Sequence, residues 1–531
     1  MKRHSHANGC GDAHEGAGLL VLAPMALEAR AIRAGAPWSR VERIGMGPRR
    51  ARAAARLTHQ PAGGSALIAG VCGALDARLQ PGDVVLASEL RTDAKTLPCP
   101  DPTILAGVLR RGGLRVHIGP IVSSSGLVFG ERRRELALAG ALAVDMESAW
   151  LADHAGAQPL TTLRVVLDTP HYEFHRPARA AVAARRAFRA LREASSLLEG
   201  WAQALGHREL ALAAPRASCA GVTRAIEIVE RALEQRGAPV YVRKQIVHNA
   251  HVVGELEARG AVFVNDVDEV PPGATVIFSA HGVSPAVRHD ALERRLDVID
   301  ATCPLVAKVH AEARRFAAGD YKIVLVGHSD HEEVEGTVGE APAHTRVIAS
   351  IEEARNIDLQ DSDPVAVLTQ TTLAVDETAE IVGALRERFP SLVVPASEDI
   401  CYATQNRQDA VRAIARDCEL ILVVGSQNSS NSRRLVEVAE RAGCRARLIE
   451  RAQDIEPELL VGVSALGVTA GASAPESLVA EVVSAIGGLG GVTLREVTVA
   501  TEETHFNLPP QVRPQNAASA GADSASQVVE D

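Results

Sequence analysis

Of the chain's 531 residues, 66 are acidic and 56 are Lys or Arg, giving a formal net charge of −10 at pH 7. A general nucleic-acid-binding protein would carry a basic surface, so we expect no nucleic-acid partner. Hydrophobic residues make up 46% and charged residues 23%, as in ordinary globular proteins. The sequence has neither an apolar run of about 18 residues nor the apolar core of a signal peptide. It therefore predicts a cytoplasmic protein without a membrane span.

The chain divides into two blocks between polar ends. Residues 1–17 and 513–531 are polar, of low complexity, and predicted to be disordered. Residues 18–193 alternate apolar runs with helical segments, which is typical of an α/β domain with a mostly parallel sheet. Residues 194–208 are expected to link this block to residues 209–512. The strands predicted in the first block are residues 19–24, 66–71, 83–90 and 161–168.

The second block repeats one plan, in which a short apolar run ends in a loop of small or polar residues. Ligands of open α/β sheets bind beyond the carboxyl ends of the strands. We therefore expect one polar ligand site shared between subdomains. The runs with their loops are residues 275–284, 322–331, 366–372, 420–430 and 466–473.

Three of the eight cysteines occupy similar local settings. Cys219, Cys303 and Cys401 each stand where a loop enters a predicted helix, and no C-x-x-C pair occurs in the chain. The helix after Cys219 is predicted to end at Gly237, the C′ residue. A helix N-terminus favours the thiolate form and so favours metal ligation. The alternative is that these are buried structural cysteines, as we expect for the other five.

Nine segments of the second block carry a family resemblance. They are CAGVTRAIEIVE, IVHNAHVV, IFSAHGVSPAVR, DATCPLVAKVH, GHSDHEEVEGT, TQTTLAVDET, DICYATQNRQDAVR, VGSQNSSNS and GVTAGASAPE. Together they resemble the 4-hydroxy-3-methylbut-2-enyl diphosphate reductases, which catalyse the last step of the non-mevalonate isoprenoid pathway. The resemblance implies three α/β subdomains in a trefoil around a central [4Fe–4S] cluster, with Cys219, Cys303 and Cys401 as ligands. It also implies reduction of an allylic diphosphate to isopentenyl and dimethylallyl diphosphate.

The resemblance further implies roles for polar residues. Glu333 matches the family's proton donor, and Thr371 matches the threonine that positions the substrate hydroxyl. The remaining matches to substrate-contacting residues are His248, His281, His331, Ser429, Ser430, Asn431 and Ser473, of which His331 also counts among the expected catalytic residues. Ala217-Ser218 and Thr223 depart from the family pattern, but no cluster ligand is lost. Ferredoxin or flavodoxin is the electron donor that the family implies.

Six segments of the first block carry a second resemblance. They are LAPMALEARAI, IGMGPRRA, GVCGALDARLQPGDVV, SSGLVFG, AVDMESAW and LRVVLDTP. Together they resemble the nucleoside phosphorylase and nucleosidase superfamily, and most of all the hopanoid-associated phosphorylase, which acts on an adenosyl-hopane. The resemblance implies a site for a purine nucleoside and phosphate. In this resemblance Glu28 is the carboxylate on the water or phosphate side, and Phe129 is the aromatic residue that stacks on the base. Met146 and Glu147 contact the ribose, and Asp168 is the general acid at purine N7.

Three hypotheses remain open at this level. The favoured one is a bifunctional enzyme in which a cluster-bearing reductase is fused to a nucleoside-cleaving domain. In the second, the first domain is a non-catalytic module that aids folding or association. In the third, the whole chain is a cluster-based redox sensor, although a sensor needs neither Glu333 nor a diphosphate pocket.

Overall fold

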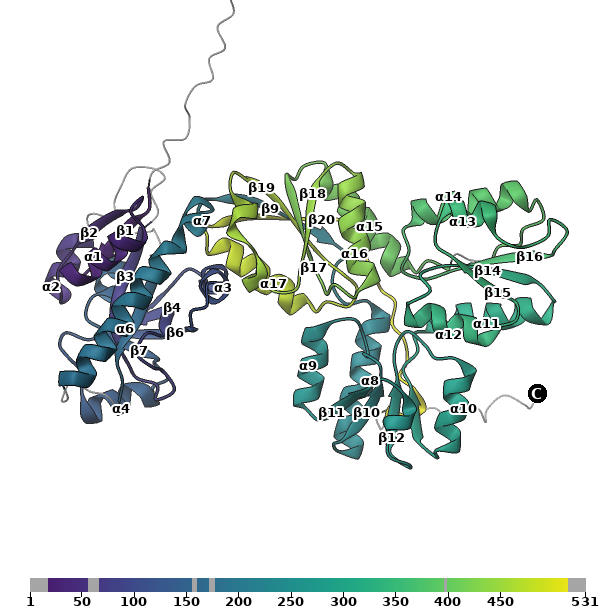
Figure 1. Cartoon of the computed structure of the whole chain (residues 1–531), viewed down its shortest axis with the longest axis horizontal. Coiled ribbons are helices and arrows are strands. Elements are labelled where there is room, and N and C mark those ends of the chain that lie inside the picture. Colours follow the sequence, from purple (N-terminus) through teal and green to yellow (C-terminus); the bar gives the residue numbers. More distant parts are fainter. Residues whose placement is uncertain (1–17, 56–65, 155–159, 171–176, 396–398, 514–531) are drawn as a thin grey trace, which may run out of the picture. The chain divides into compact units, whose positions relative to one another are not determined.

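The computed structural model describes residues 18–55, 66–154, 160–170, 177–395 and 399–513, and its ribbon is drawn in Figure 1. The predicted disordered ends, residues 1–17 and nearly all of 513–531, lie outside the described residues. The chain forms two compact units. The first comprises residues 1–208 with 451–464 and 481–493, and the second comprises residues 209–450, 465–480 and 494–531.

The first unit contains an eight-stranded sheet with the order β2-β1-β3-β7-β6-β4-β5, and β8 pairs with both β3 and β4. The pairings β3–β8–β4–β6–β7–β3 close a ring, so these five strands leave no open edge. The four predicted strands are confirmed as β1, β3, β4 and β8. The strands are β1 (Leu20–Ala23), β2 (Arg40–Arg43), β3 (Ala66–Ala74), β4 (Val84–Arg91), β5 (Thr96–Pro98), β6 (Val116–Ser123), β7 (Ala143–Asp145) and β8 (Thr161–Asp168).

Helices complete the first unit. They are α1 (Ala26–Gly35), α2 (Pro48–Ala54), α3 (Thr103–Arg111), α4 (Gly130–Leu138), α5 (Ser148–His154), α6 (Pro177–Ser196) and α7 (Leu198–Gln203). The stretch 194–208, expected as a linker, holds the end of α6, all of α7 and the first residue of β9 (Arg208–Ala214).

The first unit also includes two segments from beyond residue 208. The Arg111 guanidinium donates to the Gln453 carbonyl (2.6 Å), and the Ser484 hydroxyl donates to the Asp101 carboxylate (2.6 Å). At Gly107 this packing is so close that a Cβ would lie 1.9 Å from the Gln453 carbonyl oxygen. The compact unit therefore contains chain from both sides of residue 208.

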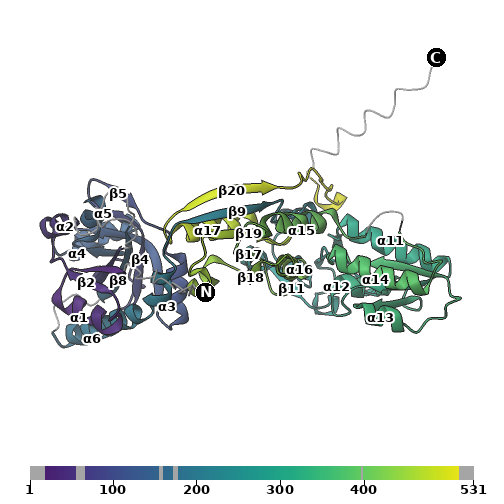
Figure 2. The same ribbon diagram turned by 90° about the horizontal axis from the view of Figure 1, so that it is seen from above.

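The second unit is built on three sheets, each in its own lobe (Figure 1). Their orders are β11-β10-β12-β13, β15-β14-β16 and β18-β17-β19-β9-β20, and Figure 2 shows β20 alongside β9 in the last of them. The strands are β10 (Val240–Arg243), β11 (Ala261–Val264), β12 (Thr275–Phe278), β13 (Asp297–Asp300), β14 (Lys322–Val326), β15 (Thr345–Ile348), β16 (Val365–Thr369), β17 (Leu420–Val424), β18 (Arg445–Ile449), β19 (Ala465–Ala470) and β20 (Val492–Thr498).

Each lobe has its own buried aliphatic core against its sheet, so the predicted α/β subdomains are confirmed. The helices are α8 (Ala220–Arg236), α9 (Ala250–Ala258), α10 (Pro285–Glu293), α11 (Pro304–Ala318), α12 (Glu332–Glu340), α13 (Ile351–Asn356), α14 (Val375–Arg388), α15 (Tyr402–Ala415) and α16 (Ser430–Arg441). A further helix, α17 (Glu476–Gly487), begins in the second unit, and its residues from 481 onward belong to the first. Within the described residues, no helix is long and apolar enough to cross a membrane.

Candidate active site

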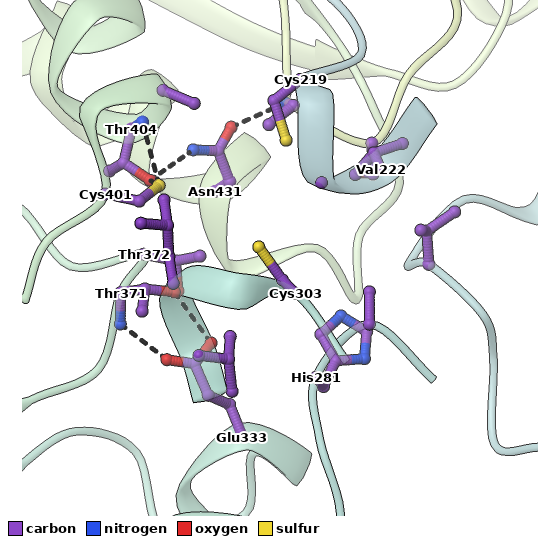
Figure 3. A pocket seen from close by; sticks show the side chains of 18 of the residues that line it. Cys219, Val222, His281, Cys303, Glu333, Thr371, Thr372, Cys401, Thr404 and Asn431 are labelled. Carbon is purple, nitrogen blue, oxygen red and sulfur yellow. Dashed lines mark hydrogen bonds between the residues drawn. The ribbon is translucent and has the colours of Figure 1, made fainter. Parts of the chain in front are cut away.

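The three singled-out cysteines are the N-cap residues of three helices, one from each lobe of the second unit. Cys219 precedes α8, Cys303 precedes α11 and Cys401 precedes α15. All three thiols line one cavity (Figure 3). A Cβ built on Gly221 would lie 2.8 Å from the Cys303 Sγ and 3.9 Å from the Cys219 Sγ, so these two sulfurs approach the same point. The fold thus brings together residues that are about a hundred positions apart in sequence.

At Cys303 and Cys401, burial opposes the effect on the thiol pKa that is expected from a helix N-terminus. It raises the pKa of Cys303 to about 11 and the pKa of Cys401 to about 12. The backbone N–H groups at the start of α11 do lower the pKa of Cys303, but desolvation is the larger effect. Among the described residues, no group of three His, Cys, Asp or Glu side chains is arranged to hold a single metal ion.

Three histidines form one wall of the same cavity. The rings of His248 and His281 stack with centroids 4.1 Å apart, and His331 meets them edge-on at 5.4 and 5.7 Å. Burial lowers the pKa of His248 to about 2 and the pKa of His331 to about 4. These two rings are therefore neutral at pH 7, and each can donate one N–H to a ligand.

Glu333 lies at the start of α12, where its side chain is buried against Thr371 (Figure 3). The Thr371 backbone N–H donates to Glu333 Oε1 (2.7 Å), and the Thr371 hydroxyl donates to Oε2 (3.0 Å). Burial raises the pKa of Glu333 above its usual range, although both bonds oppose the rise. A carboxyl group with a raised pKa at a cavity wall is suited to proton transfer.

Polar residues at the start of α16 and after β19 line the remaining side. Ser429 is the N-cap of α16, and Asn431 accepts from the Ala472 backbone N–H (2.9 Å). The Ser473 hydroxyl donates to the His248 carbonyl (2.9 Å), which ties this loop to the histidine wall. Ser430 completes the set of expected substrate contacts, and all of them line the cavity.

The cavity has further lining residues that sequence reasoning missed. Thr404, in the first turn of α15, has its backbone N–H 3.3 Å and its hydroxyl 3.0 Å from the Cys401 sulfur. Thr404 stands three residues after the N-cap residue Cys401, and in this position its backbone N–H can be expected to contact the N-cap side chain. Phe506 also lines the cavity, but it lies in a stretch without helix or strand and had no periodic pattern to mark it.

In the first unit, two of the expected carboxylates, Glu28 and Glu147, lie beside Arg164, an arginine that sequence reasoning did not single out. Arg164 is fully buried and lies 3.5 Å from Glu147 and 2.7 Å from Asp145. Glu28 accepts from the backbone N–H of Val71 (2.7 Å). A Cβ on Gly70 would be 2.5 Å from both Glu28 and Arg164. Burial raises the pKa of Glu28 and raises that of Glu147 to about 7.

The other expected residues of this unit have different surroundings. Asp168 forms an ion pair with the buried Arg133 (2.8 Å), which was also missed. Met146 is half-buried, and Phe129, the expected base-stacking residue, is 39% exposed at the N-cap of α4. The Arg133 guanidinium therefore lies against the carboxylate that the resemblance assigns as general acid.

Comparison with known proteins assigns both parts of the chain. A family model described as "LytB protein" matches residues 210–487, and one described as "Phosphorylase superfamily" matches residues 39–196, so Glu28 lies outside the latter match. A 4-hydroxy-3-methylbut-2-enyl diphosphate reductase of Mycobacterium bovis is 57% identical over 316 residues, covering 59% of this chain and 96% of that protein. The corresponding enzyme of Leifsonia xyli is 57% identical over 309 residues, covering 58% of this chain and 92% of its own length.

A solved structure agrees with the reductase matches. The E-1-hydroxy-2-methyl-but-2-enyl-4-diphosphate reductase from Plasmodium falciparum superposes with a TM-score of 0.55 at 36% identity, covering 58% of this chain and 97% of that one. The resemblances to the reductase family and to the phosphorylase superfamily are thereby confirmed. The chain carries an N-terminal phosphorylase-superfamily domain, and it belongs to the LytB protein family.

Proposed function

We propose that this protein reduces (E)-4-hydroxy-3-methylbut-2-enyl diphosphate to isopentenyl diphosphate and dimethylallyl diphosphate. The observation that carries the proposal is the meeting of three N-cap thiols, the Glu333–Thr371 pair and three histidines in one cavity. Relatives at 57% identity, almost fully covered by this chain, bear the name of this activity.

The donor set fits a [4Fe–4S] cluster. Cys219, Cys303 and Cys401 supply three thiol sulfurs in a cavity whose lining is otherwise largely apolar near α8 and α11, where Val222, Leu305 and Val306 lie. Such clusters are held by cysteine thiolates, and a bound cation would favour the thiolate form against burial. When bound by three cysteines, the cluster supplies electrons and one iron without a protein ligand.

The protein's own groups account for binding and proton delivery. Neutral imidazoles, hydroxyls and the Asn431 amide donate hydrogen bonds to diphosphate oxygens, and the N-terminus of α16 adds backbone N–H groups. Thr371 holds the Glu333 carboxyl group at the cavity wall through two bonds. Burial raises the pKa of Glu333, which suits its carboxyl group to donate a proton to the departing hydroxyl.

The reaction balances with an external reductant. The allylic C–O bond breaks, two electrons enter the substrate, one proton leaves with the hydroxyl as water, and a second proton ends on carbon. A one-electron carrier such as ferredoxin or flavodoxin would supply the electrons in two steps.

Anaerobic purification with iron and sulfide analysis tests the cluster, and reduction of the allylic diphosphate by reduced methyl viologen tests turnover. We expect about four iron atoms per chain and both isoprenoid products. A loaded cluster without turnover would instead support the redox-sensor alternative. A protein that binds no iron would refute both assignments.

A second activity is favoured for the N-terminal domain by its phosphorylase-superfamily match and by its buried carboxylates around Arg164. We propose that it cleaves a purine nucleoside, with an adenosyl-hopane as the class of substrate. The competing hypothesis, a non-catalytic module, is favoured by the ion pair between Arg133 and Asp168. Because this unit includes chain from beyond residue 208, the test uses the full chain. Adenine release that is lost in Asp168→Asn supports catalysis, and no release by the wild-type protein supports the module.

A further inference from the structure

Glu332, the first residue of α12, contacts His281, one of the three histidines that line the cavity. The His281 Nδ1 and the Glu332 Oε2 are 3.3 Å apart, and the two side chains are 16% and 19% exposed. Both atoms are buried, and neither has a hydrogen-bond partner elsewhere among the described residues. The two groups are therefore placed to satisfy each other as an ion pair. The contact uses Nδ1 and leaves Nε2 of His281 for a ligand.

Titratable and charged groups from several elements face this pair. His281 has the His248 ring stacked on it and the His331 ring at its edge. Glu332 interacts with Lys244, which follows β10, and the buried Glu333 interacts with His281. The titratable groups around His281 are therefore His248, His331, Glu332, Glu333 and Lys244.

These groups differ in the charge they carry at neutral pH. Burial holds the pKa of His248 near 2 and that of His331 near 4, so both rings are neutral. Burial would raise the pKa of Glu332, but His281 and Lys244 lower it below its usual range, so Glu332 is ionised. The His281 ring lies within ion-pair distance of the Glu332 carboxylate.

We propose that Glu332 is a positioning residue that keeps His281 protonated, so that His281 gives the cavity its one cationic imidazole for an anionic diphosphate. This inference rests on the proposed function, because it takes the cavity to bind a diphosphate. A protonated imidazole forms charge-assisted hydrogen bonds to phosphate oxygens, which are roughly twice as strong as neutral ones. Removing the Glu332 charge should therefore weaken diphosphate binding in a pH-dependent way.

The chain offers a matched control on the same helix. Glu335 also lies in the first turn of α12, but its side chain is 57% exposed and faces Arg243 at 3.6 Å. Glu332→Gln and Glu335→Gln both remove one negative charge near the start of α12. Only Glu332→Gln removes the partner of His281. An effect that comes from charge or helix stability in general should therefore appear in both variants.

The experiment titrates inorganic diphosphate into the anaerobically prepared holoprotein by calorimetry, for wild type and both variants. Titrations run from about pH 6 to about pH 8.5, across the range where histidine changes charge. We expect Glu332→Gln to bind about 10-fold more weakly than Glu335→Gln near pH 8, equivalent to about 1.4 kcal/mol, because the charge-assisted hydrogen bond from His281 to the diphosphate is lost. Near pH 6 the two variants should converge, because solution protons then charge His281 without Glu332.

Proton uptake gives an independent readout. Repeating the titration in buffers of different ionisation enthalpy should show more proton uptake per diphosphate by Glu332→Gln than by wild type near pH 8, with about one proton as the upper limit. Equal affinity and equal proton uptake in Glu332→Gln and Glu335→Gln would overturn this inference while leaving the proposed function intact. A wild-type protein that does not bind diphosphate would overturn both.

Discussion

Replacing Glu333 with Gln isolates the acidic proton from the shape of the site. In the structure the carboxyl group accepts from the Thr371 backbone N–H at 2.7 Å and from its hydroxyl at 3.0 Å. A glutamine can keep the first bond through its carbonyl oxygen and can donate its NH₂ to the hydroxyl. The volume is conserved, so we expect a stability change of about 1 kcal/mol or less. Cluster content and diphosphate affinity should persist.

Turnover should fall by about 10²–10⁴-fold, the usual contribution of a general acid, equivalent to roughly 3–5 kcal/mol in the barrier. The wild-type rate should also decline as pH rises through the raised pKa of Glu333, because the carboxylate has no proton to give. This decline in rate with rising pH should be absent in Glu333→Gln. The assay is viologen-driven reduction under single-turnover conditions, with Glu335→Gln as the control. Wild-type turnover in Glu333→Gln would refute the assignment and return the proton donor's role to another group or to water.

Three further outcomes are expected. Cys401→Ser should lose the cluster absorbance and iron whereas Cys418→Ser should keep both, and equal loss in the two variants would contradict the ligand assignment. Gly221→Ala places a methyl group 2.8 Å from the Cys303 Sγ, so iron content should fall without loss of the circular-dichroism signal of the fold. Arg407 is fully buried and donates to backbone carbonyls and a carboxylate, so Arg407→Met should lower the free energy of unfolding by about 3–5 kcal/mol in chemical denaturation.

Local sequence signals determined most of the secondary structure around the site. The helical spacing after Cys219 and the glycine at 237 predict the helix that the structure shows as α8, with Gly237 at φ +76°. The apolar runs that precede polar loops are confirmed as strands β12, β14, β16, β17 and β19. These signals succeed because capping and hydrophobic periodicity act over a few neighbouring residues. The family, too, was readable from short motifs.

Only the tertiary structure shows which side chains of the site are buried and which lie against one another. Sequence reasoning expected helix N-termini to favour thiolates, but burial raises the pKa values of Cys303 and Cys401. Spacing could not choose among the glutamates of α12, whereas the fold buries Glu333 against Thr371 and places Glu332 against His281.

The first unit shows the same limit. Nothing local in the sequence marks Arg164 or Arg133 as partners of the expected carboxylates. Nor does the sequence show that segments beyond residue 450 pack with the N-terminal domain. Desolvation and ion pairing depend on side chains from elements far apart in the chain, which only the folded arrangement brings within a few ångströms of one another.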